Sequence, residues 1–123
     1  MEKIKSFTGL ITWQESHKLV LMIYKATDNF PQKEVYSLID QMRRCGVSIG
    51  SNIAEGFSRQ SKKEKLQFYY IAKGSLTELQ NQLLVARDVQ YIDLENFNKM
   101  AEQTVIVSKL LSGLIKSAKT LNT

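Results

Sequence analysis

The sequence contains only one cysteine, one histidine and one proline among its 123 residues, and each scarcity excludes a class of structure or chemistry. The lone Cys45 cannot form an internal disulfide, and with the lone His17 it cannot complete the Cys and His ligand set of a structural zinc ion. Pro31 is the single proline, so long helices can form on both sides of it. β-branched residues do not alternate as they do in strands. We therefore expect an all-α protein without a metal ion or cofactor.

No apolar run is long enough to cross a membrane. The longest, from Leu19 to Tyr24, falls far short of the roughly 20 residues that a membrane-spanning helix requires. Residues 1–8 are mostly polar and charged, so no signal sequence is expected there. The length and the 43% apolar content predict a single globular domain over residues 1–123, and cytoplasmic residence is the default for a chain with one cysteine.

The formal net charge of +5 is unevenly distributed along the chain. Residues 1–75 hold twelve Lys or Arg against seven Asp or Glu, whereas residues 76–123 hold five against five. The excess of positive charge thus lies entirely in the first three-fifths of the sequence. Such a charge favours an anionic partner but does not require one, because many basic proteins have none.

Helical periodicity and end signals predict four long helices, at residues 12–29, 32–57, 61–88 and 93–118. Thr12 and Ser61 each precede a glutamate by three residues, as in a capping box, and Asp93 is a suitable N-cap. Pro31 ends the first helix and suits the first turn of the second. Four long helices joined by short connections predict an antiparallel up-down-up-down bundle.

The second expected helix carries a row of small residues at Gly46, Gly50 and Ala54. Each glycine in a helix costs about 1 kcal/mol relative to alanine, so we expect the backbone of another helix to pack into this row. A polar row runs beside it and contains Arg44, Ser48, Asn52, Glu55 and Arg59. This segment is typical of a contact surface.

The first and fourth expected helices are apolar on more than one face. Residues 19–24 are consecutively apolar, and the fourth helix has a similar distribution over residues 105–115. A bundle core needs an apolar stripe only about 100° wide, so both helices have apolar surface to spare. An exposed apolar stripe usually marks a protein–protein contact, and self-association is the simplest explanation.

Two isolated reactive residue types are better explained by packing than by catalysis. His17 is expected to lie partly buried at a seam between helices, beside Trp13 and Leu21. Cys45 falls on the inner stripe of the second helix, where a free cysteine acts as a small apolar residue. The neighbouring Arg43 and Arg44 leave a nucleophilic role open, which would require an activating base or a positive, exposed setting.

Glu55 and Glu78 could in principle form an acid–base pair. A more ordinary role for Glu55 is an ion pair with Arg59, four residues on, or with Arg44. Glu78 shares a helix face with Ser75, and a carboxylate retained in a bundle usually fixes how the helices meet. The sequence has no phosphate-binding loop and no nucleophile elbow, so we expect no enzymatic activity.

A basic cluster spans the junction of the second and third helices. Its six cations are expected to contact the nucleic-acid backbone: Arg43, Arg44, Arg59, Lys62, Lys63 and Lys65. Aromatic residues follow it at positions 68–70, so bases could stack near charges that hold phosphates. Phe68 is expected to face the core, which leaves at least one of Tyr69 and Tyr70 at a surface.

Several of these residues together resemble a known family. The segments are Gln41-x-Arg-Arg44, Ser48-Ile49, Ser51-Asn-Ile-Ala-Glu-Gly56, Arg59 and Ile71-Ala-x-Gly-Ser75-x-x-Glu78-Leu79. They resemble the four-helix-bundle family of 23S rRNA intervening-sequence proteins over roughly residues 8–117. Cys45-Gly46 stands where that family commonly has two alanines, and Gly50 where it often has proline.

The resemblance implies an antiparallel four-helix bundle that assembles into a ring-like homopentamer, without established enzymatic activity. It also implies a structural role for the motif residues Ser48, Asn52, Glu55, Gly56, Ser75 and Glu78. A related branch, the accessory proteins of diversity-generating retroelements, binds nucleic acid and a reverse transcriptase. Two functions stay open: an oligomer that binds RNA or DNA, and an oligomeric scaffold for a protein such as a reverse transcriptase or a ribosome-associated factor.

Overall fold

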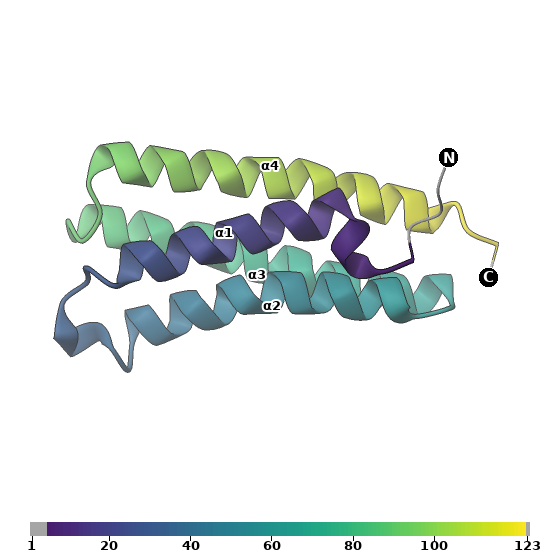
Figure 1. The fold of residues 1–123 in the computed structure, drawn as a ribbon, viewed down its shortest axis with the longest axis horizontal. Coiled ribbons are helices and arrows are strands. Elements are labelled where there is room, and N and C mark those ends of the chain that lie inside the picture. The colour runs from purple at the N-terminus through teal and green to yellow at the C-terminus, as the bar shows by residue number, and fades with distance from the viewer. Residues whose placement is uncertain (1–4, 123) are drawn as a thin grey trace.

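The computed structural model describes residues 5–122, which form four long helices packed together (Figure 1). The helices are α1 (Ile11–Thr27), α2 (Leu38–Ser58), α3 (Lys62–Asp88) and α4 (Leu94–Lys119). Two short 3-10 turns, η1 (Phe7–Gly9) and η2 (Gln32–Glu34), precede α1 and α2. The described residues contain no strand, which confirms the all-α prediction. The expected domain limits at residues 1 and 123 lie outside the described residues.

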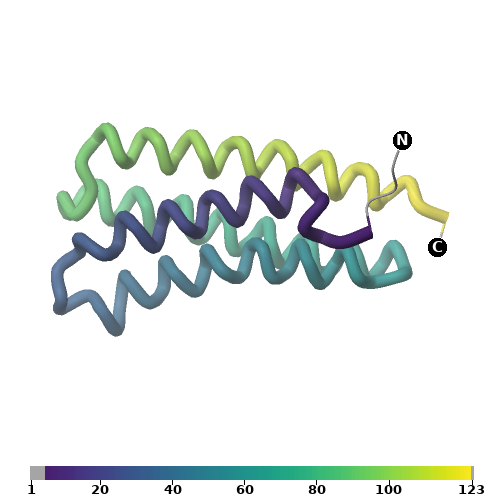
Figure 2. The backbone as a smooth tube through the Cα atoms, in the orientation of Figure 1, coloured from purple at the N-terminus to yellow at the C-terminus, as the bar shows by residue number. Residues whose placement is uncertain are grey.

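The chain turns back on itself at each connection between helices (Figure 2). The connections from α1 to α2 and from α3 to α4 lie together at one end of the molecule, at the left of Figure 1. The connection from α2 to α3 lies at the other end, together with η1 and the last turn of α4. Segments far apart in sequence are therefore neighbours at each end.

The core is a continuous stripe of apolar side chains from all four helices. Three- and four-residue spacings place Leu19 and Ile23 on the inner face of α1, and Met42, Ile49 and Ile53 on that of α2. The α3 and α4 residues that complete it are Tyr69, Ala72, Leu76, Leu79, Leu83, Ala86, Phe97, Met100, Val107, Leu111, Ile115 and Ala118. Among the described residues, no helix is long and apolar enough to span a membrane.

The second helix begins six residues later than predicted. Residues 32–34 form the separate turn η2, and α2 starts only at Leu38. The Glu34 carboxylate accepts hydrogen bonds from the Ser37 hydroxyl and, at 3.0 Å, from the Tyr91 hydroxyl in the α3–α4 connection. These hydrogen bonds lower the pKa of Glu34. Residues 32–37, which were expected to begin the second helix, instead link the α1–α2 connection to the α3–α4 connection through the hydrogen bond between Glu34 and Tyr91.

One of the three predicted helix caps is wrong. The N-cap of α1 is Leu10, which has no capping side chain, and Thr12 lies buried inside the helix. The Thr12 hydroxyl is directed toward the carbonyl oxygen of Leu110 at 3.5 Å, so it serves packing against α4. The other two caps are confirmed: Ser61 Oγ accepts a hydrogen bond from the Glu64 amide, and the Asp93 carboxylate accepts one from the amide of residue 96.

The row of small residues on α2 faces α1 at both of its glycines, and the predicted backbone contact is confirmed at Gly46 alone, because Gly50 meets side chains. A methyl group built on Gly46 would lie 2.8 Å from Val20 Cγ2 and 3.6 Å from the Val20 Cα. At Gly50 the same methyl group would meet Ser16 Oγ at 3.4 Å and Trp13 Nε1 at 3.5 Å. The two glycines thus allow α1 to approach α2 closely, and this packing offsets their cost in helix propensity.

Candidate functional site

Folding separates the charges of the chain along the long axis of the bundle. We call the half that contains the α2–α3 connection the basic half (residues 5–18, 49–74 and 107–122) and the rest the far half (residues 19–48 and 75–106). Within the described residues, the basic half holds ten Lys or Arg against three Glu, a formal charge of +7. The far half holds six Lys or Arg against eight Asp or Glu, a formal charge of −2.

This separation was missed in the sequence, where residues 76–123 are neutral as a block. In the fold, the five acids of that block lie in the far half, whereas Lys109, Lys116 and Lys119 lie in the basic half. The C-terminal lysines therefore join the basic cluster at the α2–α3 junction. The position of these lysines could have been inferred from the sequence. The third and fourth expected helices are similar in length and antiparallel, so the end of the fourth must lie beside the start of the third.

Arg43, the first of the predicted nucleic-acid contacts, is occupied within the chain. Its guanidinium donates hydrogen bonds to Thr27 Oγ1 at 2.9 Å and to Asp28 Oδ1 at 2.9 Å, and it lies 4.7 Å from the centre of the Tyr24 ring. A cation at this position also complements the negative end of the α1 helix dipole. Arg43 joins α2 to the last turn of α1 and lies in the far half, away from the α2–α3 junction.

Arg44 and Arg59 each pair with an acid on their own helix. Arg44 pairs with Asp40 at 3.0 Å, so the expected alternative pairing of Arg44 with Glu55 is wrong. Asp40 lies one turn earlier on α2, within easier reach. The other expected pair, Arg59 with Glu55, is confirmed at 3.1 Å. Both pairs are largely solvent-exposed, and such pairs contribute little to stability.

Lys65 closes the end of α2 from the neighbouring helix. Its Nζ donates hydrogen bonds to the carbonyl oxygens of Phe57 at 2.9 Å and Gly56 at 3.3 Å. Burial lowers the pKa of this lysine. No side chain fits at Gly56, because a methyl group there would lie 2.5 Å from the Tyr69 ring. The end of the Ser-Asn-Ile-Ala-Glu-Gly motif is therefore a close contact between α2 and the start of α3.

Aromatic rings at this junction are accompanied by cations. The Arg59 guanidinium carbon lies 4.8 Å from the centre of the Phe68 ring, and Lys119 Nζ lies 5.8 Å from the centre of the Tyr70 ring. Phe68 was expected to face the core, but Tyr69 occupies that position and is 2% exposed. Tyr70 is 45% exposed, which confirms that one of the two tyrosines lies at the surface.

Of the six predicted contacts, the structure brings four together at the α2–α3 junction: Arg59, Lys62, Lys63 and Lys65. Lys63 is exposed, whereas Lys62 is half-buried. Arg43 and Arg44 lie more than three helical turns away along α2. The predicted cluster is therefore two groups, and only the junction group lies in the basic half.

The other motif residues form a polar seam between α2 and α3. Ser48 Oγ and Ser75 Oγ are 2.8 Å apart, and Asn52 donates hydrogen bonds to the Ser48 carbonyl oxygen at 2.8 Å and to Ser48 Oγ at 3.0 Å. Ser75 and Glu78 line a cleft of about 260 Å³ at this seam, together with residues 41, 44, 45 and 48 of α2. The hydroxyl and amide contacts fix how the two helices meet.

The cysteine in this cleft is poorly suited to nucleophilic chemistry. Cys45 is 8% exposed, and burial, followed by the nearby Glu78 carboxylate, raises the pKa of its thiol to about 11. Gln82 Nε2 donates to Cys45 Sγ at 3.5 Å. A thiol that resists ionisation is a weak nucleophile, so the expectation of a small packing residue is the better description. The expectation that His17 is partly buried at a helix seam is wrong: it is exposed and stacked on Trp13, with ring centres 4.7 Å apart, because the buried face of α1 passes through Ser16 instead.

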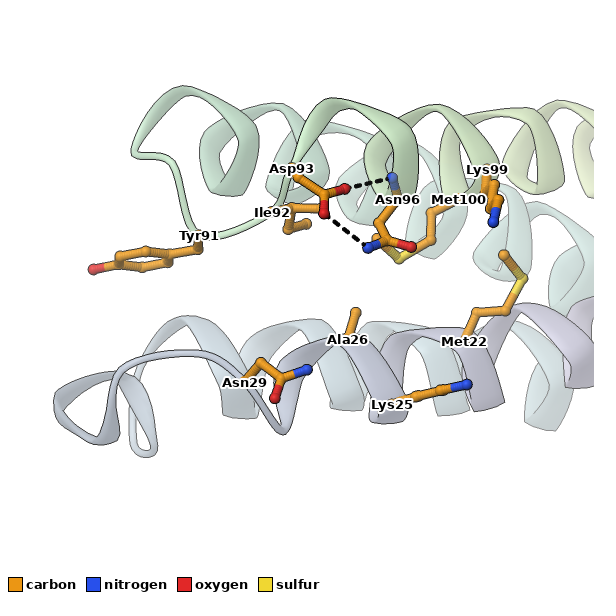
Figure 3. Close-up of a pocket in the computed structure, with 10 residues that line it drawn as sticks. All are labelled: Met22, Lys25, Ala26, Asn29, Tyr91, Ile92, Asp93, Asn96, Lys99 and Met100. Carbon is orange, nitrogen blue, oxygen red and sulfur yellow. Dashed lines mark hydrogen bonds between the residues drawn. The ribbon is translucent and has the colours of Figure 1, made fainter.

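A larger cavity of about 380 Å³ lies between α1, α4 and the α3–α4 connection, in the far half (Figure 3). Its apolar lining includes Met22 and Met100. Asp93 already accepts two hydrogen bonds from Asn96, as the dashed lines in Figure 3 show. Within the described residues, no three His, Cys, Asp or Glu side chains gather as a metal-binding group.

Apolar side chains remain exposed on α1 and α4, the two helices for which the sequence predicted more apolar surface than a bundle core needs. Leu21 and Tyr24 of α1 are 56% and 42% exposed, and Val105 and Ile106 of α4 are 46% and 38% exposed. These residues flank inward-facing neighbours such as Ile23, so each helix has a second apolar face. This surface is available to a partner or to another copy of the chain.

Comparison with known proteins agrees with this architecture. A crystal structure of a protein of unknown function from the S23 ribosomal protein family of Bacteroides thetaiotaomicron superposes with a TM-score of 0.79 at 23% identity, covering 86% of this chain and 96% of that one. No curated protein sequence matches the chain. The family model of the 23S rRNA-intervening sequence protein matches residues 8–113, which include the whole polar seam and the α2–α3 junction. The chain therefore belongs to the family of 23S rRNA-intervening sequence proteins.

Proposed function

We propose that this protein is a non-enzymatic, self-associating bundle that binds the backbone of RNA or DNA. The observation that carries the proposal is the separation of charge, with +7 on the basic half and −2 on the far half. A phosphate chain is attracted to a concentrated positive surface and releases its counterions on binding. Such contacts need no reading of the bases, so sequence selectivity is expected to be weak.

Self-association would enlarge this surface. We propose that the helices run antiparallel and that the bundle assembles into a ring-like homopentamer, held by the exposed apolar faces of α1 and α4. Leu21 and Val105 are each about half exposed, and burying such side chains would stabilise a contact between copies. A ring repeats the basic half in every subunit, and the summed field attracts a polyanion more strongly than one copy does.

A scaffold for another protein is the alternative function. The exposed apolar faces favour it, because a reverse transcriptase or a ribosome-associated factor could bind there in place of another copy. In that case the positive charge would not contribute to recognition. The two functions differ in their response to salt, since phosphate contacts weaken steeply as salt rises and apolar contacts do not.

Fluorescence anisotropy with labelled single- and double-stranded RNA and DNA, at about 50 mM salt, tests the proposal. We expect binding with little dependence on base sequence. If the protein binds none of the four probes, the nucleic-acid function is wrong and the scaffold function becomes the leading explanation. Analytical ultracentrifugation of the same sample tests self-association separately, because a single species of 14.1 kDa would exclude the oligomer.

A further inference from the structure

We infer that the bundle engages a single strand of nucleic acid at one end, with a base stacked on Tyr70 and phosphates held by the lysines at the end of α4. This inference rests on the proposed nucleic-acid function and gives it a location and a strand preference. The proposed site is formed by two parts of the chain that are about 50 residues apart in sequence, the start of α3 and the last turn of α4. Figure 1 shows both at the same end of the bundle.

Tyr70 presents an exposed ring on a well-anchored stretch of α3. Its neighbour Tyr69 is 2% exposed and packs against Gly56, so the backbone at this point of α3 is anchored in the core. Tyr70 itself is 45% exposed. Because the backbone that carries the Tyr70 ring is already ordered, only the side chain loses conformational freedom when a base stacks on it.

A cation lies over one face of that ring, so a base would stack on the other face. Lys119 Nζ lies 5.8 Å from the centre of the Tyr70 ring, within the range of a cation–π contact. Lys116 lies one turn earlier on α4, and Lys63 is exposed in the first turn of α3. Proteins that bind single strands without sequence preference combine these two elements, an aromatic platform for bases and cations along the path of the backbone.

The few acids nearby do little to cancel this charge. The basic half contains only Glu15, Glu55 and Glu64 among its described residues. The formal charge of +7 already includes these three glutamates, and Glu55 is paired with Arg59 at 3.1 Å. A strand that reaches Tyr70 therefore meets a positive surface.

A single strand suits this site better than a duplex does. In a duplex, each base is stacked between its neighbours, so its face is available to an aromatic ring only at a duplex end or after unpairing. A single strand exposes base faces along its length. Stacking on one tyrosine therefore separates the two substrates, whereas phosphate contacts alone would favour both.

The opposite end of the bundle supplies matched controls. Tyr36 is 94% exposed, more than Tyr70, but it lies in the far half, where the net charge is −2. Lys33 and Lys99 are exposed lysines of the same half. Reversing Lys33 and Lys99 changes the net charge of the protein by the same amount as reversing Lys116 and Lys119. The two double variants therefore match in net charge and differ in position, although reversing Lys99 also breaks its exposed ion pair with Glu95 at 3.4 Å. The thermal unfolding of each variant accounts for that loss.

The test is the affinity of full-length variants for a fluorescein-labelled oligodeoxythymidine of about 20 nucleotides and for a duplex of similar length, at low salt. Lys116→Glu/Lys119→Glu should weaken single-strand binding at least tenfold more than Lys33→Glu/Lys99→Glu does. Tyr70→Leu should weaken single-strand binding about tenfold and duplex binding little, and Tyr36→Leu should change neither. Thermal unfolding and sedimentation of each variant confirm that fold and assembly are intact.

Equal losses in the two double variants would overturn the location, and equal behaviour of Tyr70→Leu and Tyr36→Leu would overturn the stacking role. Wild-type binding to the duplex as tight as to the single strand would also contradict the inference. In each of these results the wild-type protein still binds nucleic acid, so the proposed function would stand. If the wild type binds neither probe, the proposed function itself fails.

Discussion

Lys65 lies in the first turn of α3, but its Nζ donates a hydrogen bond at 2.9 Å to the carbonyl oxygen of Phe57 near the end of α2. A residue that the sequence assigned to nucleic acid thus holds two helices together. We expect Lys65→Met to lower the free energy of unfolding by about 1–2 kcal/mol, because the last carbonyls of α2 lose a charged donor. Lys63→Met, in the same turn but exposed, should change it by less than about 0.5 kcal/mol. Urea unfolding measures both, and equal stabilities would show that the Lys65 contact has no energetic role.

Arg43 and Arg44 are adjacent in sequence and differ sharply in what they contact. The Arg43 side chain is 28% exposed and bonds to Thr27 and Asp28, whereas the Arg44 side chain is 79% exposed and pairs only along its own helix. Arg43→Met should therefore destabilise the protein by about 1–2 kcal/mol, and Arg44→Met by at most about 0.5 kcal/mol. Chemical denaturation of the two variants makes the comparison. A larger loss of stability in Arg44→Met than in Arg43→Met would contradict the claim that Arg43 makes the stabilising contact.

Gly56 and Gly74 are both helical glycines, and replacement by alanine should have opposite effects. A methyl group on Gly56 would lie 2.5 Å from the Tyr69 ring and 3.2 Å from the Lys65 carbonyl oxygen. Gly56→Ala should thus cost about 1–3 kcal/mol through overpacking. Gly74 has no atom within 4 Å of the added methyl group, so Gly74→Ala should stabilise α3 by about 0.5–1 kcal/mol. Thermal unfolding would contradict the packing described for Gly56 if both variants were stabilised.

The buried thiol of Cys45 predicts a specific response to pH. Its pKa rises to about 11 in the folded protein from an ordinary value of 9.0, because burial disfavours the thiolate. The thiol in the unfolded chain therefore ionises first, so its contribution to stability is complete below pH 9 and is lost as the pH rises toward 11. Wild type should lose more stability than Cys45→Ala across this window. Iodoacetamide should modify native Cys45 slowly and the denatured protein quickly. Rapid native modification would mean that the thiol is accessible.

Periodicity and end signals were sufficient to predict the four helices, because each has a strong apolar stripe and two begin at residues with capping side chains. They failed at η2, since the contact between Glu34 and Tyr91 is made across the end of the bundle by residues more than 50 positions apart. They failed at Thr12 for the same reason, because its role depends on α4. Local signals predict local structure, and long-range contacts can override them.

The candidate site was only partly visible in the sequence. The basic run at the α2–α3 junction could be recognised because its members are close neighbours in sequence. The contribution of Lys116 and Lys119 was missed because they lie far from this run in sequence and join it only when α4 returns to the same end as the start of α3. The predicted up-down-up-down arrangement of four long helices was the signal that implied it. Conversely, Arg43 resembled its neighbours in sequence, and only the fold shows that Asp28 neutralises it.

The central claim is that the positive charge of this protein serves to bind the phosphate backbone, and the salt dependence of the affinity tests it most directly. The measurement is the association constant of the wild-type protein with a single-stranded oligonucleotide between about 50 and 200 mM salt. If six or more phosphates are contacted, the affinity should fall by more than about a hundredfold over this range. Binding that stays constant as salt rises, or no binding at the lowest salt, would contradict the account.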